Sequence, residues 1–374
     1  MHEFADELGP LKVIHVHVPS IRLEAVLVVD NIARGPAIGG MRMAEDVSTE
    51  ECFRLARAMT FKNAAAGLPH GGGKIVIYGD PRMPRVEKEP LLRGLAHALR
   101  TETTYVFAPD MGMNEECMAW IRDEVERVVG LPRELGGIPL DEIGATGWGL
   151  RHAAEVAAGF CDLDLEGARL VVQGFGAVGI HAARFLVGCG AVLVAVADSR
   201  GAILDPAGLD VEALAALKRD GKSVADHPAG RCLERDAVVG VPCDIWIPAA
   251  RPDVINEDNV KQLGARLVIE GANIPITLGA ERILHERGVL CVPDFIANAG
   301  GVICAAMEYH GATESAALAA IEEKIRRNTE AVLSDARERA VLPRQAAQDM
   351  ALARLREAMS YRRWATFSSA PNYL

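Results

Sequence analysis

Two lysines and an aspartate in the first third of the chain are candidates for acid–base chemistry. Lys62 lies in MTFKNAA, Lys74 follows three glycines in HGGGKIVIYGDP, and Asp110 lies in APDMGMNE. A lysine between glycines and an apolar strand is expected to be partly desolvated, which lowers its pKa toward the range useful in catalysis. A nearby carboxylate could exchange protons with it or with a substrate. The alternative is that these are solvated surface groups, as most lysines and aspartates are.

A histidine and a glycine-rich stretch lie close to these residues in sequence. His70 stands beside the glycines that precede Lys74, and it could belong to a site or be a turn or core histidine. The stretch GPAIGGMRM (residues 35–43) presents one bulky apolar side chain, Ile38, among glycines that include Gly39 and Gly40. Because glycines let the backbone approach another group closely, we expect a loop that contacts a ligand here.

The sequence VVQGFGAVGIHAA carries the pattern GxGxxG after an apolar run and at the start of an expected helix. This context predicts dinucleotide binding: the first glycine turns tightly, the second lets backbone N–H groups meet a pyrophosphate, and the third packs helix on strand. The alternative is a glycine-rich turn without a ligand. The residues expected to contact the cofactor here are Gly174, Gly176, Ala177, Val178, Gly179, Asp198 and Ser199.

The type of dinucleotide is predicted from the end of the next apolar run. Asp198 follows Gly179 by 19 residues, where an acidic residue binds the ribose hydroxyls and repels a 2′-phosphate. NAD is therefore the expected cofactor. Arg200 could bind that phosphate, so NADP stays open.

The elements that must position these residues follow from hydrophobic periodicity. In the first part we expect strands at residues 12–18, 23–30 and 74–78 and helices at 50–65, 89–99 and 114–128, up to a turn-rich boundary near Gly136. Beyond it, strands at 168–173, 191–198, 243–249, 265–273 and 289–295 alternate with helices, which is typical of a doubly wound parallel sheet. After Gly301 the chain is expected to be helical. The predicted fold class is α/β.

Composition excludes several classes of partner. The chain has 374 residues, half of them hydrophobic, and a net charge of -11. Nucleic acids and anionic membrane surfaces require clustered basic residues, so neither is an expected partner. The sequence shows neither a signal peptide nor an apolar run long enough to span a membrane, which favours the cytoplasm. The eight cysteines form no CxxC pair, and no metal is expected.

Eight short motifs identify a resemblance, and they occur in the following order: GPAIGGMRM, MTFKNAAAGLPHGGGK, APDMGMNEECMAWI, GATGWG, QGFGAVG, IPAA, IEGANIPIT and PDFIANAGGV. Together they resemble the glutamate/leucine/phenylalanine/valine dehydrogenase family over almost the whole chain. The resemblance implies reversible oxidative deamination of an L-amino acid. A hydride leaves Cα for the nicotinamide C4, and the iminium is hydrolysed to a 2-oxo acid and ammonium.

The resemblance also implies roles for individual residues. Lys62 matches the lysine that holds the substrate α-carboxylate, and Lys74 the lysine that activates water and stabilises the carbinolamine. Asp110 matches the carboxylate that handles protons on the amine. Residues expected near the nicotinamide and its ribose, or otherwise in contact with the cofactor, are Thr146, Ala249, Asn273 and Asn298.

By the same resemblance, residues 1–136 form a domain for substrate binding and oligomer contacts, and residues 137–329 form the Rossmann-type NAD-binding domain. The catalytic cleft is expected between them, and the C-terminal helices, about 330–374, are expected to pack back on the first domain. The protein is expected to be a homo-oligomer.

Two positions bear on the amino acid that is oxidised. Members of the family that act on glutamate carry a lysine where this chain has Ile38, and a serine where it has Ala305. A carboxylate buried against Ile and Ala without a cation would cost several kcal/mol. We therefore expect an apolar L-amino acid as substrate. The alternatives are glutamate, held by another group such as Arg42, and a catalytically silent sensor of nucleotides or amino acids.

Overall fold

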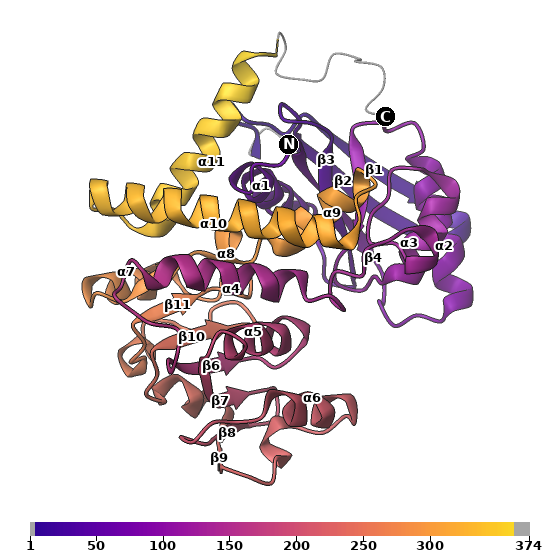
Figure 1. The fold of residues 1–374 in the computed structure, drawn as a ribbon. Coiled ribbons are helices and arrows are strands. Elements are labelled where there is room, and N and C mark those ends of the chain that lie inside the picture. Colours follow the sequence, from indigo (N-terminus) through magenta and orange to yellow (C-terminus); the bar gives the residue numbers. More distant parts are fainter. Residues whose placement is uncertain (1–3, 363–374) are drawn as a thin grey trace. The chain divides into compact units, whose positions relative to one another are not determined.

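The computed structural model describes residues 4–362, which Figure 1 colours from indigo to yellow along the sequence. The chain divides into two compact units, and it passes from one to the other four times. Of the described residues, unit 1 contains 4–139, 302–317 and 348–362, and unit 2 contains 140–301 and 318–347. None of the helices among these residues is long and apolar enough to cross a lipid bilayer.

Unit 1 is built on a five-stranded mixed sheet in the order β1-β2-β4-β3-β5. The pairs β1–β2 and β2–β4 are antiparallel, whereas β3 runs parallel to both β4 and β5. The strands are β1 (Lys12–Val18), β2 (Leu23–Asn31), β3 (Ala37–Ala44), β4 (Gly71–Tyr78) and β5 (Tyr105–Pro109).

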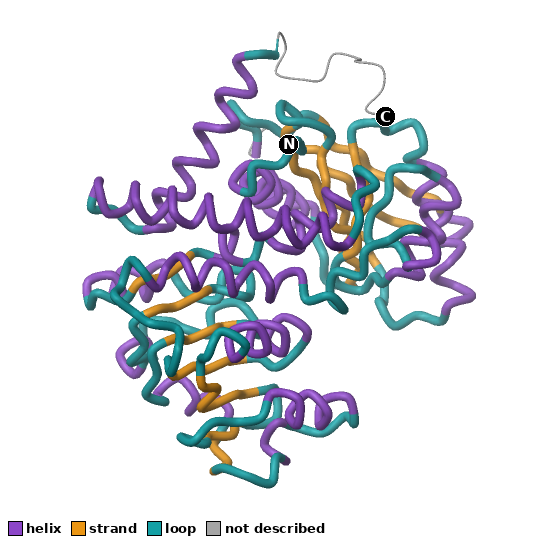
Figure 2. The backbone as a smooth tube through the Cα atoms, in the orientation of Figure 1, coloured by secondary structure: helices purple, strands orange, loops and turns teal. Residues whose placement is uncertain are grey.

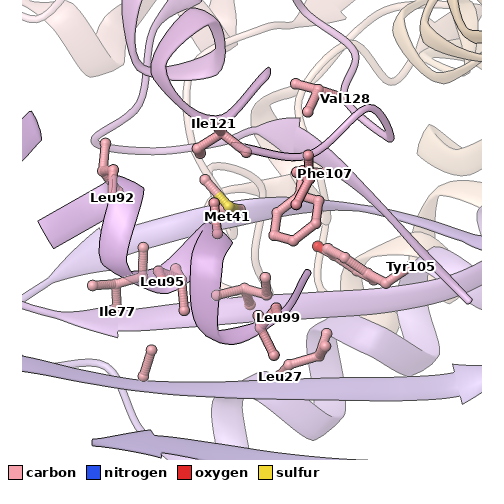
Figure 3. Packing of buried hydrophobic residues seen from close by; sticks show 14 of the residues in the cluster. Leu27, Met41, Ile77, Leu92, Leu95, Leu99, Tyr105, Phe107, Ile121 and Val128 are labelled. Atoms are coloured by element: carbon pink, nitrogen blue, oxygen red, sulfur yellow. The ribbon is translucent and has the colours of Figure 1, made fainter. Parts of the chain in front are cut away.

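Helices cover both faces of this sheet. Helix α1 (Thr49–Ala65) begins at Ser48, whose side chain accepts a hydrogen bond from the backbone N–H of Glu51, and it packs on one face through Phe53 and its neighbours. Helices α2 (Arg85–Ala98) and α3 (Glu115–Glu124) cover the other face. Figure 3 shows the packed side chains there, with Met41, Tyr105 and Phe107 from the strands facing Leu92 and Ile121 from the helices.

The prediction of a loop at GPAIGGMRM is wrong, because most of this stretch is strand β3 inside the sheet. The physical reason is steric. A Cβ at Gly39 would lie 1.7 Å from the carbonyl oxygen of Gly73 on β4, so only glycine allows the two strands to pair at this distance. The glycines that indicated a loop are therefore what permits close strand pairing.

Unit 2 contains a seven-stranded sheet in the order β12-β11-β10-β6-β7-β8-β9, drawn in orange in Figure 2. The five strands from β12 to β7 are parallel, and β8 and β9 add antiparallel pairs at one edge. The strands are β6 (Arg169–Gln173), β7 (Val192–Ala197), β8 (Ala202–Leu204), β9 (Arg231–Leu233), β10 (Ile245–Pro248), β11 (Leu267–Ile269) and β12 (Leu290–Val292). Helix α4 (Ala145–Ala158) precedes these strands, and α8 (Asp294–Ala297) follows them. The helices between the strands are α5 (Ala177–Val187), α6 (Val211–Arg219) and α7 (Leu278–Glu286).

Three further helices complete the described chain: α9 (Gly300–Tyr309), α10 (Glu314–Arg339) and α11 (Pro343–Ser360). Most of α10 belongs to unit 2, where it lies along α4 (Figure 1). The Trp148 indole donates to the carbonyl of Leu318, and Arg326 pairs with Glu155. The division differs from the sequence-based expectation, in which all residues from about 330 onward belong with the first domain. Within that range Arg337 donates to the carbonyl of Phe160 and Arg344 contacts Glu270, so residues 330–347 stay with unit 2.

Candidate active site

Lys74 and Asp110 are brought together at the centre of the unit 1 sheet. Lys74 lies on β4 and is 5% exposed, and Asp110 follows β5 directly. The Lys74 Nζ lies 2.5 Å from Asp110 Oδ2, which also accepts a 3.2 Å hydrogen bond from Nε of Arg42. Arg42 is held in turn by Glu51 on α1. The sequence placed these groups 36 residues apart, and the parallel order β4-β3-β5 closes that gap.

The charge on Asp110 follows from these neighbours. Burial opposes its ionisation, but the charges of Lys74 and Arg42 outweigh burial and hold the pKa of Asp110 below its usual value. Its side chain is 27% exposed, so a substrate can reach it. At neutral pH the group is a carboxylate, which can accept a proton from a substrate amine.

Ile38 lies on the same face of the sheet as this pair. Side chains alternate along a strand, so Ile38, Gly40 and Arg42 of β3 share one face. A Cβ at Gly40 would lie 2.6 Å from Cβ of Asp110 and 3.3 Å from Nζ of Lys74, which identifies the face as the one that carries the pair. Gly39 points to the opposite side, and its carbonyl accepts a hydrogen bond from the Tyr105 hydroxyl.

Helix α1, which carries Lys62 in its last turn, packs on the same face. The neighbouring Asn63 is buried and donates to the carbonyls of Ile38 and Gly71, which fastens the last turn of α1 to β3 and β4. A Cβ at Gly72 would lie 2.0 Å from the backbone nitrogen of Thr60, so helix and sheet are in close contact. Asn63 was not among the predicted site residues, although its place beside Lys62 in MTFKNAA was a signal.

Ala305 is carried by α9, which is anchored within unit 1. The carboxylate of Glu308 accepts hydrogen bonds from the backbone N–H groups of Gly130, Leu131 and Ile138 at 2.8–3.1 Å. Glu308 is buried, and burial raises its pKa despite these three donors. Ala305 is 8% exposed. No sequence motif pointed to Glu308, because its partners are backbone groups.

In unit 2 the GxGxxG residues have the geometry that a pyrophosphate requires. Gly174 follows β6 with φ +98°, and a Cβ there would lie 2.7 Å from the backbone of Ala249. A Cβ at Gly179 would lie 1.9 Å from the carbonyl oxygen of Gly174, so helix α5 packs closely on the turn. Gly176 has open space around it, and Ala177 behind it is exposed, whereas Val178 is half-buried. The first N–H groups of α5 are therefore available to an anion.

Further predicted cofactor residues gather at the ends of neighbouring strands. Ala249 follows β10 and lies next to Gly174, which follows β6. Asn298 donates to the side-chain oxygen of Asn273 at 3.1 Å, beyond the end of β11. Thr146 lies at the start of α4, with its hydroxyl 3.3 Å from where a Cβ on Gly301 would be. In doubly wound sheets ligands bind at the carboxyl ends of the strands, so these residues fit a bound dinucleotide.

Asp198 differs from the expectation in one respect: both of its oxygens already have internal partners. It accepts hydrogen bonds from Lys218, from the hydroxyl of Ser223, and from the backbone N–H groups of Arg200 and Val224, at 2.6–3.0 Å. Burial opposes ionisation, but these donors outweigh it and lower the pKa of Asp198 to about 2. Ser199 and Arg200 beside it are exposed. The sequence could not indicate these partners, because they follow in α6 and the turn after it.

A buried cluster of charged residues supports the Asn273 segment. Arg344, next to the first residue of α11, contacts the carboxylates of Glu281, Asp294 and Glu270 at 2.7, 2.9 and 2.7 Å. Asp294 also accepts a hydrogen bond from the backbone N–H of Ile274, a β-branched residue with φ +49°. Such a conformation persists only where the surroundings hold it. No sequence motif indicated this cluster, because its members lie up to 74 residues apart in the chain.

Comparison with known proteins identifies the same family in both halves of the chain. A family model described as Glutamate/Leucine/Phenylalanine/Valine dehydrogenase matches residues 136–363. A second, described as Glu/Leu/Phe/Val dehydrogenase, dimerisation domain, matches residues 10–127.

Named relatives extend over most of the chain. The NADP(+)-dependent glutamate dehydrogenase of Pyrobaculum calidifontis is 37% identical and covers 95% of this chain and 92% of its own length. The NAD-specific glutamate dehydrogenase of Staphylococcus aureus is 35% identical with the same coverage. The crystal structure of a hetero-hexameric glutamate dehydrogenase from Thermus thermophilus, in a leucine-bound form, matches with a TM-score of 0.83 and 32% identity, over 94% of this chain and 90% of that one.

The ordered motifs, the paired Lys74 and Asp110, the glycine-rich turn at Gly174 and both family matches all indicate the same family. The relatives include both NAD-specific and NADP-dependent enzymes. The chain therefore belongs to the Glu/Leu/Phe/Val dehydrogenase family and is an NAD(P)-dependent amino acid dehydrogenase that acts on the CH–NH2 group of its substrate.

Proposed function

We propose that the protein oxidatively deaminates an apolar L-amino acid to the 2-oxo acid and ammonium. The observation that carries this proposal is Ile38, a buried apolar side chain on the sheet face that also bears Lys74 and Asp110. A substrate whose Cα lies at this pair would place its side chain toward an apolar wall. Ala305 is the second apolar position in the proposal, and its small size leaves room for a long or aromatic side chain.

In the proposed reaction Lys62 binds the α-carboxylate and Asp110 accepts a proton from the substrate ammonium group. The neutral amine lone pair then forms the C=N bond as the hydride leaves Cα. When bound, the dinucleotide supplies the hydride acceptor. Neutral Lys74 accepts a proton from a water molecule as that water adds to the iminium carbon, and the lysine then donates a hydrogen bond to the carbinolamine. Asp110 returns its proton to the carbinolamine nitrogen. Collapse of the carbinolamine releases ammonium and the 2-oxo acid.

Glutamate is the second candidate, and the names of the relatives support it more directly than they support an apolar substrate. Its distal carboxylate would need a cation. Arg42 is the cation on this face that the sequence suggested, and in the structure it contacts Asp110 and Glu51. For Arg42 to bind the substrate it would have to leave these partners, which disfavours glutamate and supports the first candidate.

We propose NAD as the principal cofactor, because Asp198 keeps its negative charge where the ribose is expected. The hydrogen bonds from Lys218 and Ser223 reduce its capacity to bind both ribose hydroxyls. Discrimination against NADP is therefore expected to be incomplete. We further propose a homo-oligomer, because the model that matches residues 10–127 is described as a dimerisation domain.

The substrate proposal is tested with a panel of L-amino acids, monitored by formation of the reduced cofactor. We expect leucine, valine, isoleucine, methionine or phenylalanine to have a higher kcat/KM than glutamate. Ile38→Lys should shift this preference toward glutamate by tenfold or more, since it places a cation opposite the distal carboxylate. Ile38→Met is the matched control without a charge. Wild-type protein that oxidises glutamate fastest would overturn the proposal, and turnover of none of these substrates would favour a sensor.

A further inference from the structure

His70 is buried, immediately precedes β4, and has a partner on each ring nitrogen. Its Nδ1 lies 3.1 Å from the carbonyl oxygen of Pro36, and its Nε2 lies 3.2 Å from Nε2 of His310. Burial, together with the nearby His310, lowers the pKa of His70 to about 4, so the ring is neutral at physiological pH. Nδ1–H therefore donates to Pro36, Nε2 accepts, and His310 must donate from its own Nε2–H.

The two partners of His70 belong to the two segments that bear the proposed specificity residues. Pro36 lies two residues before Ile38 on β3. His310 follows the last residue of α9, five residues after Ala305, and Tyr309 at the end of α9 packs edge-on to the His70 ring with centroids 5.6 Å apart. His70 is thus in direct contact with both segments, and all of these residues belong to unit 1.

The His70–His310 contact is separate from the anchoring of either segment. The backbone N–H of Gly71 donates to the carbonyls of Gly35 and Pro36, which joins the start of β3 to β4 without the histidine rings. Glu308 holds α9 to the segment around residues 130–138. Neither set of bonds joins α9 to β3. Loss of the imidazole contact would therefore leave the sheet and the helix folded, but it would allow the end of α9 to shift relative to His70 and β3.

We propose that His70 and His310 form a positioning link that sets the distance between the segment of Ile38 and the segment of Ala305, and thereby selects substrates by side-chain length. Neither histidine is a catalytic residue in this proposal. The inference deepens the proposed function and rests on it for the location of the substrate side chain. The proposed link does not depend on which amino acid is the substrate, because the separation of the two segments limits the length of any side chain that binds between them.

The test compares His310→Phe, which keeps an aromatic ring but removes the donor, with His310→Gln, whose amide nitrogen can donate from a similar position. We measure kcat and KM for two amino acids of different side-chain length that the wild type oxidises. His310→Phe should change the ratio of the two kcat/KM values by about two- to tenfold, the range of one neutral hydrogen bond. The change should lie mainly in KM, and His310→Gln should restore the ratio.

Two outcomes would overturn the link: an unchanged ratio in His310→Phe, or equal changes in His310→Phe and His310→Gln. Thermal unfolding of each variant identifies a loss caused by misfolding. In that case His70→Phe, which removes the acceptor, and His70→Gln, which keeps an acceptor near the Nε2 position, supply the same comparison. Failure of the proposed function remains distinguishable. If the wild type prefers glutamate, the link is tested with glutamate and aspartate instead of two apolar amino acids.

Discussion

Replacing Arg344 with methionine should destabilise unit 2 more than any other single change we consider. The side chain is 11% exposed, and it contacts three carboxylates whose side chains are 0–8% exposed. Methionine preserves much of the volume but removes the only charge that balances Glu281, Asp294 and Glu270 within these contacts. Leaving one partner of a buried pair uncompensated costs about 3–5 kcal/mol of unfolding free energy. We expect a loss in this range at pH 8.

The loss of unfolding free energy in Arg344→Met should depend on pH. The direction of this dependence follows from the number of protons that the native and the unfolded state bind. Burial raises the pKa of Glu270 to about 8, against an unfolded value near 4.5. Between these values the native state binds more protons than the unfolded state, so stability falls as pH rises through this window. Arg344 opposes that shift by favouring the ionised carboxylate. Without it, native carboxyl groups bind protons more tightly still, so the Arg344→Met loss should be larger at pH 8 than at pH 5.

Native-state hydrogen exchange can measure this effect within one unit, because the opening free energy of the β10 and β11 amides reports unit 2 directly. Arg344→Lys is the matched control: it keeps the charge but cannot direct separate donors at three carboxylates, so an intermediate loss is expected. Opening free energies within about 1 kcal/mol of wild type in Arg344→Met would refute the reasoning. So would a loss that is equal at both pH values.

Two further predictions concern the site itself. Lys74→Ala should reduce kcat by at least about 10²-fold, because it removes the group proposed to activate water. The dissociation constant for NAD should stay within about twofold of wild type, because Lys74 and the GxGxxG turn belong to different units. Steady-state kinetics and calorimetric titration check this, and turnover within tenfold of wild type would contradict the role. Lys218→Ala should remove one of the four hydrogen-bond donors to Asp198 and shift binding toward NAD over NADP by several-fold. Lys222→Ala is the control on an exposed neighbouring lysine. Unchanged dissociation constants for both dinucleotides would show that the contact does not affect selectivity.

Several expectations could be made from sequence because they depend on local pattern. The α/β class is confirmed, since apolar runs and helical periodicity are properties of neighbouring residues. The GxGxxG turn also follows its pattern, because a strand that feeds directly into a helix requires small residues at fixed positions. The prediction of a loop at GPAIGGMRM was wrong because the role of its glycines depends on a distant strand. Gly39 is needed for contact with Gly73 on another strand, and no local rule distinguishes that need from the need of a turn.

The sequence by itself determined the family, the α/β class and the identity of the residues that can do chemistry, because motifs and periodicity are local. Only the tertiary structure decided which of these residues meet. It paired Lys74 with Asp110, gave Asp198 its internal partners and placed His70 between Pro36 and His310. The physical reason is that hydrogen bonds and ion pairs depend on distances of about 3 Å between segments far apart in sequence, and strand order and close glycine packing set those distances.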